Sequence, residues 1–123
     1  MRIEPCSKNS QDEWLPLRQC LWPHPDNEHR DEMKRALDNP DAMSFLARDE
    51  SGAAIGFAEA TLRHDYVNGC TTSPVGFLEG LYVRPDCRRH GVARALCQAV
   101  EGWVRGRGCS ELASDTWLGH HES

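Results

Sequence analysis

The fold is decided by one stretch of sequence, GLYVRPDCRRHGVARAL at residues 80–96, which predicts a strand that turns through a short basic loop into a helix. Residues 75–83 form an apolar, strand-favouring run, and the proline-containing loop after them favours a turn. From Val92 to Trp103, apolar residues recur mainly at spacings of three and four, the pattern of a helix with one buried stripe. We therefore expect a strand, a tight basic loop and a helix in succession.

The junction between this loop and its helix has the composition of an anion-binding site. The first N–H groups of a helix have no partner within the helix, and its N-terminus carries a partial positive charge. In the pattern Arg88-x-x-Gly91-x-Ala93, small residues leave room for a phosphate to lie against the backbone. A glycine-containing turn with solvated arginines explains so short a pattern equally well. A dinucleotide-binding Rossmann site is a weaker alternative, because the pattern G-x-G-x-x-G is absent.

Two helices and a β-hairpin are predicted before this stretch. The first helix is expected to begin within residues 9–12 and to stop before Pro23. The second is expected to run from residue 26 to the Asn-Pro pair at 39–40. Residues 43–48 and 54–63 are β-tolerant runs joined by a turn-rich link, which predicts an antiparallel hairpin.

The chain as a whole predicts a single domain of the α/β class, residues 1–123, with a mixed sheet. Short strands are expected at residues 2–5 and 111–115, and a meander followed by a strand-helix-strand unit produces a layered fold. The 123 residues suit one modest core. No apolar stretch approaches the ~20 residues that cross a bilayer, and the first residues lack a signal-peptide core. A cytoplasmic protein without a membrane partner is therefore expected.

Charge is unevenly distributed along the chain. Residues 1–80 carry 8 basic and 14 acidic side chains, whereas residues 81–123 carry 6 basic and 5 acidic ones. An acidic first part suits a cationic partner and a locally basic second part suits an anionic one, although solubility alone would explain the same charges. The basic residues form one short cluster and no extended stripe, which argues against a nucleic-acid partner.

The six cysteines are expected to be free thiols that hold no metal. They contain no C-x-x-C pair and are too sparse for a disulfide scaffold. The nearest metal-like group, Cys20 with His24 and His29, lacks a second pair of ligands. Cys87 and Cys97 have no evident histidine base beside them, so covalent catalysis is not expected.

Together with the strand before it and the helix after it, the 80–96 segment resembles the acetyl-CoA site of the GNAT superfamily of N-acetyltransferases, whose signature is Gln/Arg-x-x-Gly-x-Gly/Ala. The resemblance implies a GNAT-like acyl-CoA N-acyltransferase fold with acetyl-CoA as co-substrate. It places the pyrophosphate on the loop and helix start and the pantetheine arm on the edge of the preceding strand. The cofactor-binding residues that it implies are Leu81, Tyr82, Val83, Arg88, Arg89, His90, Gly91, Val92, Ala93 and Arg94.

Five separated segments, residues 21–23, 63–69, 73–75, 77–80 and 113–116, together resemble the aminoglycoside 6'-N-acetyltransferases. This resemblance implies acetyl transfer to the 6'-amine of a polycationic antibiotic, and hence antibiotic resistance, by a homodimer. The acceptor-pocket residues that it implies are Trp22, Tyr66, Glu79 and Asp115. From the residues alone, Trp22 is equally well a hydrophobic plug and Tyr66 a surface loop residue, and Asp115 is alternatively a turn residue.

Glu79 is the expected catalytic residue. A carboxylate in an apolar strand is costly without a partner or water, so it implies either a site role or a salt bridge to a nearby arginine. An alkylammonium of pKa ~10 must lose a proton before it attacks a thioester, at a cost of about 4 kcal/mol at pH 7. We expect Glu79 to accept or relay that proton, Asp115 to anchor the cationic substrate, and backbone N–H groups near Leu81 to polarise the thioester carbonyl.

The resemblance breaks near the end of the chain. The family continues past the 113–116 strand with a further helix and two strands, and residues 117–123 are too short and too polar to supply them. We therefore expect a fold that lacks its last helix and strands, with unpaired edges that favour association. Two alternatives stay open: an acetyltransferase of the same fold that acts on another small amine or a peptide, and an inactive truncated product that binds CoA.

Overall fold

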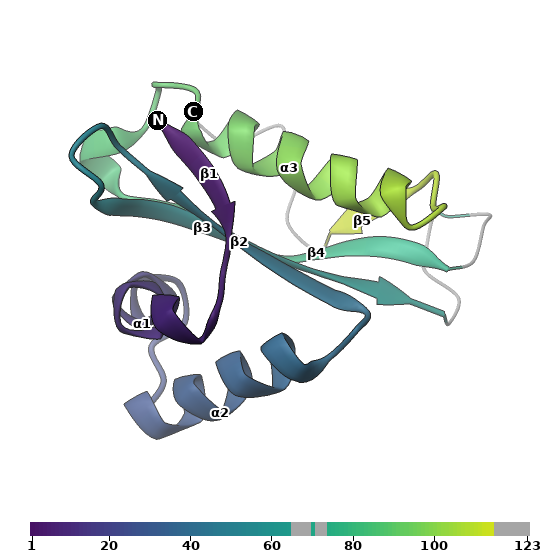
Figure 1. Cartoon of the computed structure of the whole chain (residues 1–123), viewed down its shortest axis with the longest axis horizontal. Coiled ribbons are helices and arrows are strands. Elements are labelled where there is room, and N and C mark those ends of the chain that lie inside the picture. Colours follow the sequence, from purple (N-terminus) through teal and green to yellow (C-terminus); the bar gives the residue numbers. More distant parts are fainter. Residues whose placement is uncertain (65–69, 71–73, 115–123) are drawn as a thin grey trace.

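A five-stranded sheet with helices on both faces forms the part of the chain that this computed structural model describes, residues 1–64, 70 and 74–114 (Figure 1). The strands lie in the order β1-β2-β3-β4-β5. The pairs β1–β2, β2–β3 and β3–β4 are antiparallel, and β5 runs parallel to β4. The elements are β1 (Arg2–Pro5), η1 (Lys8–Ser10), α1 (Gln11–Leu21), α2 (Asp26–Asp38), β2 (Ala42–Arg48), β3 (Ala54–Arg63), β4 (Val75–Val83), η2 (Pro85–Cys87), α3 (Val92–Gly106) and β5 (Leu112–Ser114). The mixed α/β class, the hairpin and the order of elements are as predicted.

Local signals end the first two helices where the sequence predicts. The Trp22 N–H bonds to the Arg18 carbonyl at the end of α1, and Asn39 closes α2 directly before a proline. The start of α1 at Gln11, with Ser10 as its N-cap residue, also lies within the predicted residues 9–12. A 3-10 turn precedes the helix, and Ser7 forms a capping box with Ser10 around that turn. The 3-10 turn and its cap are additions that the sequence analysis did not predict.

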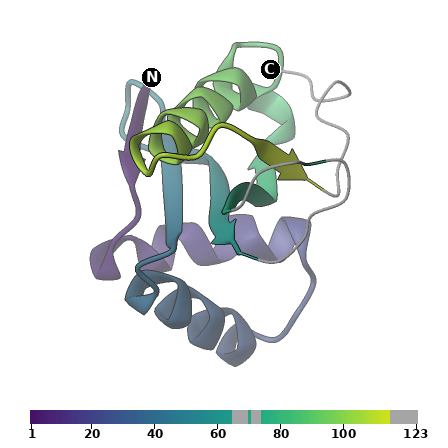
Figure 2. The ribbon, with the colours of Figure 1, turned by 90° about the vertical axis from the view of Figure 1, so that its right-hand side faces the viewer.

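Two cores lie on opposite faces of the sheet, one under α3 and the other under α1 and α2 (Figure 2). Large side chains in the α3 core are Ile55, Leu62, Leu78, Leu81, Val83, Leu96, Val100 and Val104. The core under α1 and α2 contains Trp14, Leu15, Leu17, Met33, Leu46 and Phe57. The sheet is thus buried on both faces. Within the described ranges, none of the helices combines the length and the apolar character that crossing a membrane requires.

A β-bulge in β4 decides which of its side chains face each layer. Glu79 is the extra residue, because its neighbours Leu78 and Gly80 pair with consecutive residues of β3. The bulge lets Leu78 and Leu81, three positions apart, both reach the α3 core, which the two-residue period of a regular strand does not allow. Gly80 faces the other layer, where it lies against the Trp22 ring.

The described pairing between β4 and β5 is short. Among the residues that the structure describes, β5 pairs with Gly76, Phe77 and Leu78 of β4. In the described part of the chain, residues 80–83 of β4 therefore pair with β3 alone, and the bulged Glu79 pairs with neither neighbouring strand. This half of β4 leads directly into the loop before α3, so a backbone edge and a helix N-terminus lie in succession.

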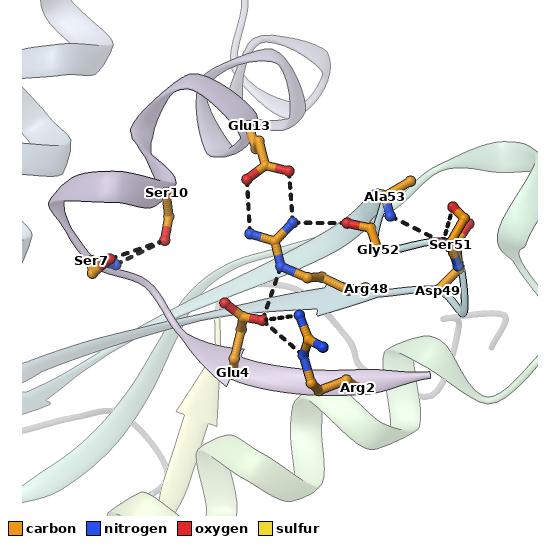
Figure 3. Close-up of polar contacts among 10 residues, drawn as sticks. All are labelled: Arg2, Glu4, Ser7, Ser10, Glu13, Arg48, Asp49, Ser51, Gly52 and Ala53. Atoms are coloured by element: carbon orange, nitrogen blue, oxygen red, sulfur yellow. Dashed lines mark hydrogen bonds and ion pairs between the residues drawn. The ribbon is translucent and has the colours of Figure 1, made fainter.

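Arg48 of β2 holds the first half of α1 against the sheet (Figure 3). Its guanidinium donates to both carboxylate oxygens of Glu13 at 2.6 and 2.8 Å, to Glu4 of β1 at 2.9 Å and to the Gly52 carbonyl at 2.9 Å. Charge-assisted bonds of this kind are stronger than neutral ones, and the Arg48 side chain is mostly buried. They fix the first turn of α1, at a distance from the residues that line the cleft described next.

Candidate functional site

A cleft of about 420 Å³ is lined by residues of α1, α2, β3 and β4 and of the turn between the two helices. Its lining residues are Arg18, Trp22, His24, Glu32, Glu59 and Glu79. Three of the six are carboxylates and one is a guanidinium, so the lining has an excess of negative charge, which favours a cationic occupant. The fold therefore brings together Trp22 and Glu79, two of the four residues predicted for the acceptor pocket.

Glu79 is both paired with an arginine and placed on the cleft. Thr61 Oγ1 donates to its Oε2 at 2.6 Å, and Arg63 NH2 donates to both carboxylate oxygens at 3.0 and 3.1 Å. The side chain is still 31% exposed, and it lines the cleft. The salt bridge that the sequence raised as one alternative is thus present, and the side chain also lies on the cleft, while its site role stays a prediction. Thr61 and Arg63 fix the direction in which the carboxylate points.

Trp22 forms a rigid wall of the same cleft. Its ring lies so close to Gly80 that a Cβ at that position would come within 2.4 Å of the indole. The ring also packs edge-on against Phe57, with centroids 5.9 Å apart, and the Arg18 guanidinium carbon lies 4.9 Å from its centroid. Trp22 is therefore packed against its neighbours, as a hydrophobic plug would be, and it also lines the cleft. Its role in binding the acceptor stays a prediction.

A buried ion pair below this wall was missed by the sequence analysis. Arg18 of α1 binds Glu59 of β3 through two bonds, Nε to Oε2 at 2.6 Å and NH2 to Oε1 at 3.1 Å. Trp14 Nε1 donates to the same Oε2 at 2.9 Å. The pair was detectable in principle, because Glu59 interrupts an apolar strand as Glu79 does. The sequence does not indicate that its partner is Arg18, which lies 41 positions away.

Arg18 also contacts α2. Its NH1 group donates to Glu32 Oε1 at 2.9 Å and lies 2.7 Å from His29 Nδ1. Burial alone would lower the pKa of Arg18, but the bonds and charges of Glu59 and Glu32 outweigh burial and raise it. Burial alone would likewise raise the pKa of Glu32, but the bond and charge of Arg18 lower it. The guanidinium therefore stays charged at the floor of the cleft.

His29 is fully buried and has a partner at each ring nitrogen. Because Arg18 only donates, Nδ1 must accept, which places the ring proton on Nε2. Nε2 then donates to the Trp22 carbonyl at 2.8 Å. His29 belonged to the metal-like group considered from the sequence, and both of its nitrogens are engaged elsewhere. Among the described residues, His, Cys, Asp and Glu form no group of three or more that could hold a metal ion.

The loop into α3 makes the turn that an anion site needs. Gly91 precedes the helix with φ of 82°, a left-handed conformation that favours glycine. A Cβ built there would meet nothing within 4 Å, so the space beside the backbone is open. Gly91 brings no capping side chain, and the first N–H groups of α3 can therefore bind an anion.

The side chains predicted to bind the cofactor differ in what they can offer. Leu81, Val83, Val92 and Ala93 are buried in the α3 core, so their backbone groups are what they can present. Arg89, His90 and Arg94 are exposed, and Tyr82 is half-buried. Arg88 donates from Nε to the Val83 carbonyl at 2.9 Å, and its guanidinium lies 5.7 Å from the Tyr82 ring. Arg88 therefore links the end of β4 to the loop.

Tyr66 and Asp115, the other two residues predicted for the acceptor pocket, lie outside the described residues. The six cysteines are free thiols, as predicted. Burial raises the pKa of both Cys87 and Cys97, which disfavours the thiolate that a nucleophile requires.

Comparison with known proteins finds similar chains over most of this sequence. The model of the acetyltransferase (GNAT) family matches residues 11–123. Aminoglycoside N(6')-acetyltransferase type 1 of Acinetobacter genomosp. 13 is 48% identical over 118 residues, which cover 96% of this chain and 81% of that protein. The protein of the same name from Serratia marcescens is 48% identical over 119 residues, covering 96% of this chain and 82% of the relative.

Solved structures agree with this chain in fold as well. The apo aminoglycoside antibiotic 6'-N-acetyltransferase AAC(6')-IG from Acinetobacter haemolyticus superposes with a TM-score of 0.91 at 44% identity, covering 98% of this chain and 82% of that one. AAC(6')-Iy in complex with the bisubstrate analogue CoA-S-monomethyl-acetylneamine superposes with a TM-score of 0.90 at 46% identity, covering 97% and 81%.

Proposed function

This chain belongs to the acetyltransferase (GNAT) family, among the aminoglycoside 6'-N-acetyltransferases, and from that membership we propose that it transfers the acetyl group of acetyl-CoA to the 6'-amine of an aminoglycoside. The observation that carries the proposal is the position of Glu79. It is the bulged residue of β4, and it lines an acidic cleft just beyond the last described β4–β5 pair. A polycationic amine suits such a cleft.

Acetyl-CoA would lie along the second half of β4. In the described part of the chain, the edge of residues 79–83 that faces away from β3 has no strand partner, and apart from the Val83 carbonyl, which accepts from Arg88 Nε, it suits the pantetheine arm. The open space at Gly91 and the first N–H groups of α3 suit the pyrophosphate. The path from Gly91 back along β4 leads to Glu79, so this placement brings the thioester to the cleft. Backbone N–H groups near Leu81 would stabilise the charge that develops on the thioester oxygen.

The acceptor amine would enter the cleft between Trp22 and Glu79. Its ammonium form must lose a proton, at a cost of about 4 kcal/mol at pH 7 for a group of pKa ~10. We assign Glu79 the role of proton acceptor or relay, with Thr61 and Arg63 holding its carboxylate. The free amine then attacks the thioester carbonyl, and CoA leaves as the thiol. No covalent enzyme intermediate is part of this proposal.

The decisive experiment compares two acceptors that differ at one group. Release of the CoA thiol is measured with an aminoglycoside that carries a 6'-amine and with the matched compound that carries a 6'-hydroxyl. Turnover with the amine alone supports the proposal. Turnover with small amines or peptides but with neither aminoglycoside assigns the chain another acceptor, and CoA binding without any turnover assigns it no transferase activity. The homodimer stays a prediction, which the native mass with and without acetyl-CoA tests.

A further inference from the structure

Trp22 is held from two sides by one connected set of polar groups. The ring lies under the Arg18 guanidinium, 4.9 Å from its carbon atom, while the Trp22 carbonyl accepts from His29 Nε2 and from the His24 N–H, each at 2.8 Å. His29 in turn accepts from Arg18 NH1. Arg18 therefore touches Trp22 directly through the ring and indirectly through the carbonyl.

The same guanidinium is anchored to the sheet. Its bidentate bond to Glu59 links α1 to β3, and Trp14 Nε1 completes the coordination of that carboxylate. Both ends of the anchor are nearly inaccessible, with side-chain exposures of 6% for Arg18 and 11% for Glu59. Such a bidentate pair fixes direction as well as distance. The position of the Trp22 ring relative to β4 is therefore set by a rigid path through Arg18.

Stability alone does not account for this arrangement. Buried ion pairs are weak evidence for stability, because well-packed apolar residues of similar volume often replace them without loss. Here one guanidinium makes three bonds to the cleft-lining residues Glu59 and Glu32, and a fourth contact to His29, which binds the carbonyl of the cleft-lining Trp22. These directed bonds therefore fix the positions of the side chains around Arg18. Apolar contacts, which have no preferred direction, would fix them less closely.

We propose that Arg18 is a positioning residue that, anchored by Glu59, holds Trp22 against Gly80 and so sets how well the cleft binds the acceptor. The inference rests on the proposed function, because it takes the cleft to be the acceptor site. It concerns the acceptor alone: neither Arg18 nor Glu59 lies on the second half of β4 or the α3 loop, where acetyl-CoA is placed.

The test uses Arg18→Lys, which keeps the charge but loses the bidentate fork and the planar contact with Trp22. Arg48→Lys is the matched control, since Arg48 is also mostly buried and also bridges two glutamates, away from the cleft. We expect Arg18→Lys to raise KM for the aminoglycoside about tenfold, which corresponds to ~1.4 kcal/mol. Both kcat and KM for acetyl-CoA should stay within about twofold of the wild-type values. Arg48→Lys is expected to lower Tm without changing KM for the aminoglycoside.

A second substitution separates positioning from general loosening. In a Trp22→Ala background the wall is already absent, so Arg18→Lys should add little to KM for the aminoglycoside. Full additivity of the two changes would overturn the inference, as would an unchanged KM in Arg18→Lys alone. If Arg18→Lys fails to fold, Glu59→Gln, which keeps an acceptor for Arg18, takes its place with the same expected split.

One measurement does not depend on turnover. In protein labelled with 5-fluorotryptophan, Trp22→Phe identifies the fluorine resonance of Trp22, and Arg18→Lys should shift or broaden that resonance while leaving the resonance of Trp103 unchanged. An unmoved Trp22 resonance would overturn the positioning role whether or not the protein is an enzyme. If the wild-type chain acetylates no aminoglycoside but the Trp22 resonance moves, the proposed function fails and the link from Arg18 to Trp22 survives without its acceptor role.

Discussion

Two glutamates occupy interior strands of the sheet, and their partners distinguish them. Glu59 is bound by Arg18 and Trp14 and is nearly buried. Glu79 is bound by Thr61 and Arg63 but keeps 31% of its side chain exposed at the cleft. A buried, fully partnered carboxylate serves geometry, whereas an exposed one can also meet substrate. This difference is why we assign the proton-accepting role to Glu79 alone.

Replacing Glu79 by alanine should lower kcat about 100-fold and leave the Kd for CoA within about threefold, because proton transfer by a positioned side chain contributes factors of roughly 10² to 10⁴. Initial rates and calorimetric CoA binding measure the two effects. Glu50→Gln serves as control, since Glu50 is an exposed carboxylate whose described partner is the N-terminal amine. Equal losses in kcat and in CoA binding would place Glu79 elsewhere than at the acceptor.

Gly80 and Gly102 form a second matched pair. A Cβ at Gly80 would come within 2.4 Å of the Trp22 ring, whereas a Cβ at Gly102 in α3 would meet nothing within 4 Å. Gly80→Ala should therefore displace Trp22, cost about 1–3 kcal/mol of stability and raise KM for the aminoglycoside. Gly102→Ala should stabilise by about 0.5–1 kcal/mol, because alanine is the better helix former. Thermal unfolding and KM show both effects, and a silent Gly80→Ala would disprove the close approach.

At the scale of elements, the start of α3 depends on one backbone conformation. Gly91 at φ 82° and Gly52 at φ 88°, in the β2–β3 turn, both adopt a left-handed conformation with open space around them. Alanine at either position should cost about 1–2 kcal/mol of stability, since a Cβ is strained in that region.

The effect of these two substitutions on acetyl-CoA should differ. Gly91→Ala adds a methyl group where the pyrophosphate is placed, so KM for acetyl-CoA should rise about tenfold or more. Gly52→Ala should leave KM for acetyl-CoA unchanged, because the β2–β3 turn takes no part in that site. Similar KM values for acetyl-CoA in the two variants would remove the α3 start from the cofactor site.

The described pairing of β4 with β5 stops at Leu78, and the bulge follows at Glu79. The two features are adjacent. The described pairing with β5 therefore ends at the same place where the bulge reverses which side chains of β4 point to each face of the sheet. A bulge of this kind redirects side chains and disrupts the ladder locally. The element that presents Glu79 to the cleft is thus the same element whose backbone edge we propose for acetyl-CoA.

For the whole molecule, arginine–carboxylate pairs join elements distant in sequence, and they predict acid sensitivity. Side-chain bonds from Arg2 and Arg48 hold the pKa of Glu4 below its usual range, as Arg48 does for Glu13. In Glu32 the Arg18 contacts outweigh burial to the same effect. Each such carboxylate contributes stability that is present above its unfolded pKa, about 4.5 for glutamate, and is lost as pH falls through the lower folded pKa.

We therefore expect Tm to change little from pH 8 to pH 6 through these carboxylates and to fall steadily from about pH 5 to pH 3. Differential scanning calorimetry across this range is the measurement. At 0.5 M salt the fall should be shallower, because most of these pairs are partly exposed and screened. A Tm that stayed level from pH 5 to pH 3 would show that the pairs contribute nothing to folding.

The sequence by itself determined the borders of the elements, because the signals for them are local. Pro23 and the pair at 39–40 end helices, the link at 49–52 turns the hairpin, and Gly91 starts α3. It also indicated the family, since the resemblance to aminoglycoside acetyltransferases agrees with relatives that are 48% identical over 96% of this chain. Trp22 and Glu79 were predicted in this way as pocket residues, and both line the cleft.

Only the tertiary structure decided the geometry of the cleft. The bulge at Glu79 depends on the register of β4 against β3, and the Arg18–Glu59 pair joins residues 41 positions apart. Neither feature can be predicted from the spacing of residues along the chain, because both depend on how the helices and the sheet pack against each other. The physical reason is that a buried polar group must bond to a group close to it in space. The order of residues along the chain does not say which groups become neighbours in space.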